Sequence, residues 1–373
     1  MKRRVWLLGV LGVLMAAVAL PTTASAAGVA FAAHRDSRVG GAPYGVAIGD
    51  FDRDGRADLV TADFKDGTVS VLRRTGAARF AGRRHFRVGK NPGWVAVGYF
   101  NNDAKLDLVT SNFKDNSVSV LGGKGTCGFG AHHDFAVGRQ PYCVAVGDFN
   151  GDGKADLVTA NYEDSTVSVL LGNGRSNFSA HHDYAVGAGP VTVAGGDFNG
   201  DGHLDVVTGN YTARSVSVLL GDGAGGFAAH HDFAVGGQAV SVAVADFNGD
   251  DHADVATADL DAKCVSVLLG DGTRGFAAHH DFAVGGRLAS VAVGDFNGDG
   301  AMDLVATSLA TNKVCVLLGD GTGGFAAHHD FAVAKGPDSV AVGKLNGDSR
   351  PDVVTSNYAT SSVSVLLNAT GRH

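Results

Sequence analysis

The sequence contains little charge, little proline and few sulfur-containing residues. Its 373 residues include 7 prolines, 4 cysteines and 3 methionines, and only 18% of them are charged. Low charge together with 45% hydrophobic residues excludes a disordered chain, which needs the opposite balance. Lysine and arginine (30) are fewer than aspartate and glutamate (38), so the net charge of −8 argues against a nucleic-acid-binding protein.

The first 26 residues have the pattern of an export signal. Three cations at positions 2–4 precede an apolar stretch at 5–20, and Ala24-Ser25-Ala26 is typical of a cleavage site. The apolar stretch is slightly short for a membrane span, and a retained N-terminal anchor is the alternative. We therefore expect residues 27–373 to be secreted into the extracellular space, with no membrane span left after signal removal.

One unit of 49 residues recurs seven times. The segment Gly-Asp-Phe-Asn-Gly-Asp-Gly of the third unit has its first aspartate at 148, and the equivalent positions are 50, 99, 197, 246, 295 and 344. A second marker starts with a phenylalanine at 31, 80, 129, 178, 227, 276 and 325. Two markers with the same constant spacing indicate one repeated structural unit.

Each unit has the pattern of four short strands. In the third unit, apolar or alternating segments occupy 143–147, 156–161, 166–171 and 178–186, and no segment has helical period. Clusters of Gly, Asn and Asp separate them, as hairpin turns require. Four antiparallel strands in a repeat of this length are typical of a β-propeller blade.

The two ends of the chain complement each other. The chain begins with a fourth-strand segment, Phe31–Val39, and ends after a third-strand segment, Ser362–Leu367. The N-terminal strand can therefore complete the last blade and close the ring, whereas an open solenoid, the alternative, needs capping ends. We predict an all-β fold, a single seven-bladed β-propeller over residues 27–373 with four antiparallel strands per blade.

The loop between the first and second strands of a unit has the ligand pattern of a calcium site. In the third unit, side-chain oxygens stand at positions one, three, five and nine, with a backbone carbonyl at position seven. Alternating oxygen ligands suit a hard cation that takes six to eight of them. Five loops are complete: Asp50, Asp52, Asp54 and Asp58; Asp148, Asn150, Asp152 and Asp156; Asp197, Asn199, Asp201 and Asp205; Asp246, Asn248, Asp250 and Asp254; Asp295, Asn297, Asp299 and Asp303.

Two loops lack the first aspartate. Tyr99 replaces it in the second unit, where metal binding stays open, and Lys344 replaces it in the seventh, where the ammonium can neutralise the carboxylates. Asx turns that hold no metal are the alternative for the complete loops. Because the carboxylates of an empty loop would repel each other, we expect about five structural Ca²⁺ ions.

The sequence Asp-Phe-Asn-Gly-Asp-Gly, followed by Asp-[Leu/Val]-Val-Thr, resembles the FG-GAP or VCBS repeat family. Such repeats form the heads of integrin α chains, and similar ones form fungal sugar-binding lectins and secreted bacterial proteins. The resemblance covers residues 28–373 and all seven units. It implies a seven-bladed propeller with calcium in the loops between strands one and two, in a family that serves adhesion, sugar binding and accessory roles in enzymes.

The four cysteines are predicted to be unpaired, although secretion would permit disulfides. Cys127 and Cys143 lie at opposite ends of a strand, too far apart to bridge. Cys264 and Cys315 lie on third strands of adjacent blades and should each face a different neighbour. We expect four free thiols.

Histidine pairs recur on the fourth strands and could form a transition-metal array. Adjacent residues of a strand point to opposite faces, so a pair cannot readily chelate one ion. Surface residues on the propeller rim are the favoured interpretation of these pairs, which are His132-His133, His181-His182, His230-His231, His279-His280 and His328-His329.

The seven units differ most in the connections between strands two and three and between strand four and the next blade. Antiparallel alternation places both kinds of connection on the face opposite the calcium loops, and variable loops on a constant scaffold often carry binding residues. Aromatic rings there suit sugars or a protein hot spot, whereas drift in unselected loops, with Trp94 filling the channel, is the alternative. The candidate ligand-binding residues are Tyr44, Trp94, Tyr142, Lys65, Lys114, Glu163 and Arg214.

These features favour a secreted, calcium-stabilised, non-catalytic module for binding or adhesion. Its expected partner is an extracellular glycan or protein rather than nucleic acid, and we expect a monomer. No Ser/His/Asp or Cys/His set stands out from the repeated scaffold. The alternatives are a polysaccharide hydrolase or lyase, with catalytic residues from different blades meeting near the channel, and a purely structural role, so the question of catalysis stays open.

Overall fold

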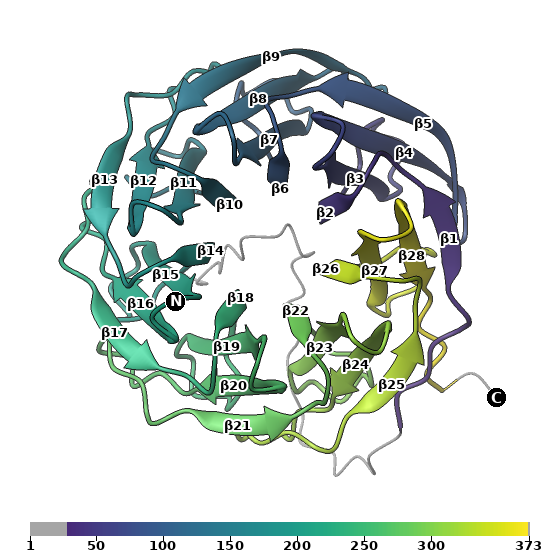
Figure 1. The fold of residues 1–373 in the computed structure, drawn as a ribbon, viewed down its shortest axis with the longest axis vertical. Coiled ribbons are helices and arrows are strands. Elements are labelled where there is room, and N and C mark those ends of the chain that lie inside the picture. The colour runs from purple at the N-terminus through teal and green to yellow at the C-terminus, as the bar shows by residue number, and fades with distance from the viewer. Residues whose placement is uncertain (1–27, 372–373) are drawn as a thin grey trace, which may run out of the picture.

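The computed structural model describes residues 28–371, and the predicted export signal lies outside them. Within this range the chain forms 28 strands, grouped into seven four-stranded antiparallel sheets around a common axis (Figure 1). The described residues contain no helix. The predicted all-β, seven-bladed β-propeller is confirmed.

The strands of each blade are given from the innermost to the outermost. Blades 1 to 4 consist of β2 (Pro43–Gly49), β3 (Asp58–Asp63), β4 (Thr68–Gly76) and β5 (Arg79–Arg87); β6 (Pro92–Gly98), β7 (Asp107–Asn112), β8 (Ser117–Gly123) and β9 (Phe129–Ala136); β10 (Pro141–Gly147), β11 (Asp156–Asn161), β12 (Thr166–Leu170) and β13 (His182–Ala185); β14 (Pro190–Gly196), β15 (Asp205–Asn210), β16 (Ser215–Leu219) and β17 (His231–Ala234). Blades 5 to 7 consist of β18 (Ala239–Ala245), β19 (Asp254–Asp259), β20 (Cys264–Leu268) and β21 (His280–Ala283); β22 (Leu288–Gly294), β23 (Asp303–Ser308), β24 (Lys313–Leu317) and β25 (His329–Ala332); β26 (Pro337–Gly343), β27 (Asp352–Asn357), β28 (Ser362–Leu366) and β1 (Arg35–Arg38).

The N-terminal strand closes the ring, as the sequence predicts. In blade 7, β1 pairs with β28 in an antiparallel register that sets Arg35 opposite Val365 and Arg38 opposite Ser362. An isolated bridge between Phe31 and Asn368 extends this pairing. The ring therefore has no unpaired blade edge where its two ends meet.

The two phenylalanine markers meet between neighbouring blades. Phe149, which follows the first aspartate of the loop in blade 3, packs edge-to-face on Phe227 at the start of the outer segment of blade 4, with 5.9 Å between ring centroids. The equivalent pairs elsewhere include Phe51 with Phe129, at 5.7 Å. Because each loop contacts the outer segment of the next blade, both markers must recur with the same period.

A buried polar chain links the three outer strands of most blades. In blade 4, the Asn210 amide and the Gly187 backbone amide donate hydrogen bonds to Ser217 Oγ, at 2.7 and 2.9 Å. Ser217 Oγ in turn donates to Asp232 at 2.5 Å. Ser217 is fully buried, so this chain satisfies polar groups that would otherwise destabilise the sheet.

All four cysteines are free and buried, which confirms the prediction of unpaired thiols: Cys127, Cys143, Cys264 and Cys315. None of the described residues forms a helix that is both long and apolar enough to cross a lipid bilayer.

Candidate functional site

The complete loops between the first two strands of a blade are built by hydrogen bonds within the loop. In blade 3, Asp148 accepts hydrogen bonds from the backbone amides of Asp152 and Gly153, at 3.1 and 2.8 Å. Asn150 accepts a second bond from the Asp152 amide at 3.0 Å. Gly153 has a φ of +78°, a conformation that strains residues with a side chain. The side-chain oxygens of Asp148 and Asn150 thus converge on the same backbone amide.

The aspartate at position nine of the loop is a buried structural residue. Asp156 is fully buried, and its carboxylate accepts hydrogen bonds from the amides of Phe149 and Gly172, at 2.9 and 2.7 Å. The incomplete loops keep the same contact: Asp107 accepts from Phe100, and Asp352 accepts from Leu345. The ninth position therefore ties the loop to the end of the third strand whether or not the first aspartate is present.

Sequence reasoning assigned position nine to the metal and missed this structural role. The signal was visible, because both incomplete loops lose the first aspartate but keep Asp107 and Asp352. An aspartate that is retained in a loop without the first metal ligand has a role besides metal binding.

Burial raises the pKa of the ninth aspartates. It raises the pKa of Asp156 to about 6, and the nearby Asp148 and Asp152 carboxylates contribute in the same direction. The same causes raise the pKa of Asp205 and of Asp303 to about 7. Crowded carboxylates of this kind are stabilised by a nearby positive charge.

The donor set of the loops fits a hard cation. In blade 1, the carboxylates of Asp50, Asp52 and Asp54 offer oxygens within 4.8 Å of one another. Arg73 contacts Asp52 and lies 3.5 Å from Asp54, and in blade 3 Lys154 lies 2.8 Å from Asp152 and lowers the pKa of that carboxyl. Protein cations thus already reach two of these loops, and oxygen is the ligand atom that calcium prefers.

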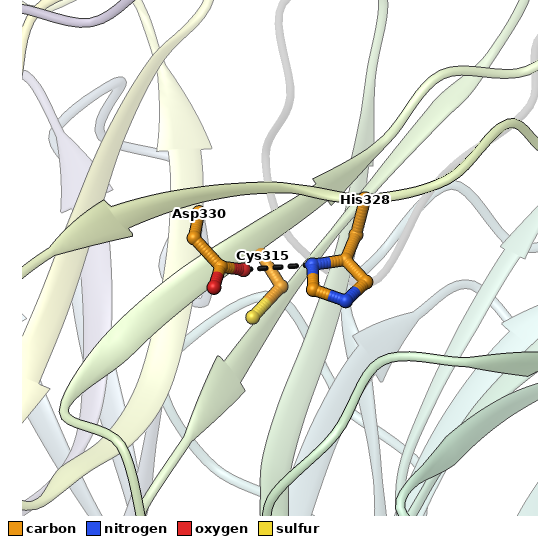
Figure 2. Close-up of side chains that lie close together, drawn as sticks. All are labelled: Cys315, His328 and Asp330. Atoms are coloured by element: carbon orange, nitrogen blue, oxygen red, sulfur yellow. Dashed lines mark hydrogen bonds and ion pairs between the residues drawn. The ribbon is translucent and has the colours of Figure 1, made fainter.

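A different group of metal-ligating side chains occurs in blade 6. Figure 2 shows the sulfur of Cys315 beside Asp330 and His328. His328 Nδ1 lies 2.7 Å from Asp330 Oδ1, and Lys313 Nζ lies 2.9 Å from the other carboxylate oxygen. Cys315 replaces the buried serine that the six other blades carry at this position. Two more thiol-containing groups consist of Asp52, Asp58 and Cys127, and of Asp259, Cys264 and Asp281.

The histidine pairs do not converge on one point. His132 and His181, like His328, place Nδ1 within 2.8 Å of the aspartate two residues further along the strand. That aspartate lies on the same face of the strand, whereas the neighbouring histidine lies on the other. The contacts agree with surface residues of the rim rather than with a pairwise chelate.

The opposite face of the ring carries the variable connections. In each blade the turn between strands two and three lies against the connection that enters the blade, as when the Phe64 amide donates to the Ala42 carbonyl and the Tyr162 amide to the Gln140 carbonyl. The innermost strands surround the common axis of the ring (Figure 1). Side chains from these turns and from the start of the innermost strands lie around the axis on this face, in a region that we call the mouth.

Aromatic side chains line this mouth over five consecutive blades. Tyr44 of β2 packs on Tyr358 and Phe64, with 5.2 and 4.6 Å between ring centroids. Tyr142 of β10 packs on Phe113 and Tyr162, at 4.9 and 5.7 Å, and Tyr162 continues to Tyr211 at 6.5 Å. We call these residues the aromatic arc: Tyr358, Tyr44, Phe64, Phe113, Tyr142, Tyr162 and Tyr211.

Asp338 is the second residue of β26, the innermost strand of blade 7. Burial raises its pKa to about 7. After burial, its charge is the next cause that raises the pKa of Tyr44, and it also raises that of Tyr142. Tyr44 and Tyr142 belong to blades 1 and 3, so one carboxyl of blade 7 acts on residues of two other blades.

The structure brings together only some of the residues that the sequence nominated for ligand binding. Tyr44 and Tyr142 belong to the aromatic arc, and Lys65 Nζ lies 5.8 Å from the centre of the Tyr358 ring. Trp94 packs instead against two hydrophobic clusters, one of blades 2 and 3 and one of blades 3 and 4. Glu163 lies 3.3 Å from Arg139, and Lys114 and Arg214 are exposed on the same face. Sequence reasoning missed the five aromatic residues of the turns, although they recur at one fixed position of the repeat.

The fold and its loops define a β-propeller repeat protein. An FG-GAP-like repeat model matches six overlapping segments: 50–110, 100–159, 148–208, 197–257, 261–306 and 295–355. These segments cover most of the chain, which therefore belongs to the FG-GAP-like repeat family. No curated protein sequence matches the chain.

Several solved structures share the fold. BBS1N, crystallised in complex with ARL6DN, superposes with a TM-score of 0.66 at 13% identity over 92% of this chain and 97% of that one. An inactive virginiamycin B lyase from Staphylococcus aureus with quinupristin gives 0.61 at 11% identity over 90% and 99%. An Agrocybe aegerita lectin that recognises non-reducing terminal N-acetylglucosamine gives 0.55 at 19% identity over 91% and 86%.

Proposed function

We propose that this chain is a calcium-stabilised, extracellular binding module that takes a glycan at this mouth, around the axis of the ring. The aromatic arc is the observation that carries this proposal. Its rings lie around one opening on consecutive blades, and the exposed Tyr358 and the half-buried Tyr44 and Tyr142 offer apolar surface beside polar hydroxyls. Such surfaces suit the apolar faces and hydroxyl edges of sugars.

Asp338 adds a polar group to this mouth. A carboxyl near the rings of Tyr44 and Tyr142 can accept hydrogen bonds from sugar hydroxyls when it is ionised. Few polar groups beside a largely apolar surface are the usual composition of a small-molecule site. Binding is the role that this combination of aromatic and polar groups supports best.

Calcium is assigned a structural role in this proposal. The residues that would hold it are those at positions one, three and five of the five complete loops; in blade 1 their carboxylate oxygens lie within 4.8 Å of one another. A bound ion would supply positive charge to carboxylates that otherwise repel each other. The aspartate at position nine of each loop holds the loop in place by accepting hydrogen bonds from backbone amides.

A glycan array with the full chain tests the ligand. We expect binding that falls at least about tenfold in Tyr358→Ala and Tyr142→Ala, since an aromatic ring that a ligand covers contributes more than about 1.4 kcal/mol to binding. Tyr99→Ala is the matched control, because Tyr99 is exposed but lies in the loop between strands one and two, on the opposite face. Equal losses in all three variants, or no glycan bound by the folded protein, would exclude the aromatic arc as a glycan site. Capture of a protein by the same residues would favour a protein partner instead.

Export is proposed from the pattern of residues 1–26. When the full chain is expressed in a secreting host, the culture medium should contain a protein whose mass corresponds to cleavage after Ala26. A cell-retained chain of full mass would contradict export.

A further inference from the structure

The outer strands of the propeller fall into two chemically different groups. Five of them contain the sequence His-His-Asp, at 132–134, 181–183, 230–232, 279–281 and 328–330. The outer strands of blades 7 and 1 carry arginines instead. We call these six residues the arginine face: Arg35 and Arg38 of β1, and Arg79, Arg83, Arg84 and Arg87 of β5.

The arginine face is continuous across the seam between blades 7 and 1. The strands β1 and β5 follow each other around the rim (Figure 1). Arg83 donates a hydrogen bond to the Val39 carbonyl at 2.8 Å, and Arg35 donates to the Ala77 carbonyl at 3.2 Å, so each arginine reaches across to the other blade. Arg84 reaches the opposite way, to the Thr126 carbonyl of blade 2.

No carboxylate neutralises these arginines within residues 28–371. The arginines that form ion pairs in this range are Arg73 and Arg139. In blade 1, His85 takes the place of the strand aspartate that the other blades carry, and Asp36 of blade 7 accepts hydrogen bonds from Ser364 and pairs with His34. All six arginines are exposed. A local excess of positive charge therefore lies on a chain whose net charge is −8.

The surface at this seam is also hollowed. A shallow depression of about 450 Å³ is lined by residues of β1 and of the β4–β5 hairpin, including Arg35, Arg79 and one carboxylate, that of Asp36. A neighbouring depression of about 350 Å³ includes His34, Arg35 and Ala78. Guanidinium groups at the edge of a hollow can bind planar or tetrahedral anions through two parallel hydrogen bonds.

We propose that the arginine face binds an anionic polysaccharide that carries carboxylate or sulfate groups, at a site separate from the aromatic arc. The aromatic rings of these strands do not offer a stacking surface for nucleic-acid bases, since Phe86 and Phe80 are half-buried and Phe86 packs on Phe129. Arginines that form no ion pair and are spread along two extended strands instead match charges that recur along a flexible chain.

Binding of the full chain to dextran sulfate, polygalacturonate, unsulfated dextran and duplex DNA at pH 8 tests this proposal. We expect dextran sulfate or polygalacturonate to bind, with affinity that falls on the order of 100-fold between 50 and 200 mM salt if about five charges are neutralised. Unsulfated dextran should not bind. Tighter binding of duplex DNA than of both charged polysaccharides would overturn the assignment of ligand class.

The repeat provides a variant that should preserve the fold. Arg35→His, Arg38→Ala, Arg83→His, Arg84→His and Arg87→Ala install at each position the residue that blades 4, 5 and 6 already carry. We expect this combined variant to lose at least about tenfold in affinity and to show a weaker salt dependence, with an unchanged melting midpoint. Histidine is neutral at the pH chosen.

Arg175→His, Arg274→His and Arg287→His together form the control for charge. These arginines are exposed, lie on other parts of the ring and are absent from the ion pairs of the described residues. The control removes three positive charges and the outer-strand variant five, so the two are compared by the loss of affinity per charge removed. An equal loss per charge would show that net charge rather than the arginine face controls binding, and no loss in the outer-strand variant would overturn the proposal.

Discussion

Ser364 in β28 donates a 2.6 Å hydrogen bond to Asp36 in β1, and this bond joins two residues that lie 328 positions apart. In blade 3 the same bond joins Ser168 to Asp183, which lie 15 positions apart. The last blade thus forms from both ends of the described chain the contact that other blades form within one hairpin. Closure of the ring therefore uses the same serine–aspartate hydrogen bond that joins the two outer strands of other blades.

A chain that begins at Gly40 should therefore lose the closure of the ring. Deletion of β1 leaves β28 as an open edge and removes the buried side chains of Val29 and Val39. We expect the thermal midpoint to fall by on the order of 10 °C and the protein to self-associate with increasing concentration. Calorimetry and sedimentation check both effects. The variant Arg35→His with Arg38→Ala, which retains the strand, is the control, and equal behaviour of the two would contradict this account.

Calcium removal should lower stability in proportion to the loops affected. A chelator is expected to lower the melting midpoint, because ligand that binds only the folded state stabilises it by mass action. Native mass spectrometry should count one ion fewer in Asp246→Ala and no change in Lys344→Ala. The substitution Lys344→Asp should add one ion, since it restores position one beside Asn346 and Asp348. The same number of bound ions in all three variants would refute the assignment of calcium to these loops.

The two roles of the loop aspartates can be separated in blade 4. Asp205 is buried and accepts bonds from the amides of Phe198 and Gly221, both at 2.8 Å, whereas Asp201 is exposed in the loop. Asp205→Asn should lower the free energy of unfolding by about 1–3 kcal/mol even in chelator, because one buried amide loses its acceptor. Asp201→Asn should change stability only when calcium is present. Denaturant titrations with and without calcium compare the two.

The buried carboxyl of Asp338 should make the stability of the protein depend on pH. Burial raises the pKa of Asp338 to about 7 in the folded protein, above the value of about 3.9 expected in the unfolded chain. The folded state then binds the proton more tightly, so this stabilising contribution is complete below about pH 4 and is lost as the pH rises through 7.

Asp338→Asn should remove this dependence, because the amide stays neutral. At pH 8 we expect the variant to be more stable than the natural chain by on the order of 2–4 kcal/mol, with little difference at pH 4. Unfolding titrations across this range check the sign. A variant that is less stable at pH 8 would indicate that the charged carboxylate is stabilised by its surroundings.

Much of the fold followed from the repeat because the sequence contains its own comparison. Seven equal spacings predicted seven equal units, and alternation within a unit predicted four strands. The predicted segment 156–161 coincides with β11, whereas the predicted 178–186 contains the shorter β13, His182–Ala185. Outer strands pair on one side only and end early, so their limits are the least visible in the sequence.

The candidate sites were predicted less completely. The pattern of oxygens identified the loops, but it could not distinguish the exposed Asp152 from the buried Asp156, because burial depends on packing against the third strand. The net charge argued against a basic surface, although the arginines of 79–87 depart visibly from the other outer strands. A total charge averages over the molecule, whereas a ligand meets only one part of its surface.

The sequence by itself determined the number of blades, the order of strands and the identity of the loop residues, because period and alternation are local properties of the chain. Only the tertiary structure decided which side chains meet: Tyr44 with Tyr358, Arg83 with the end of β1, and Asp338 with tyrosines of two other blades. These neighbours come from different repeats, and curvature of the closed ring rather than spacing along the chain brings them together.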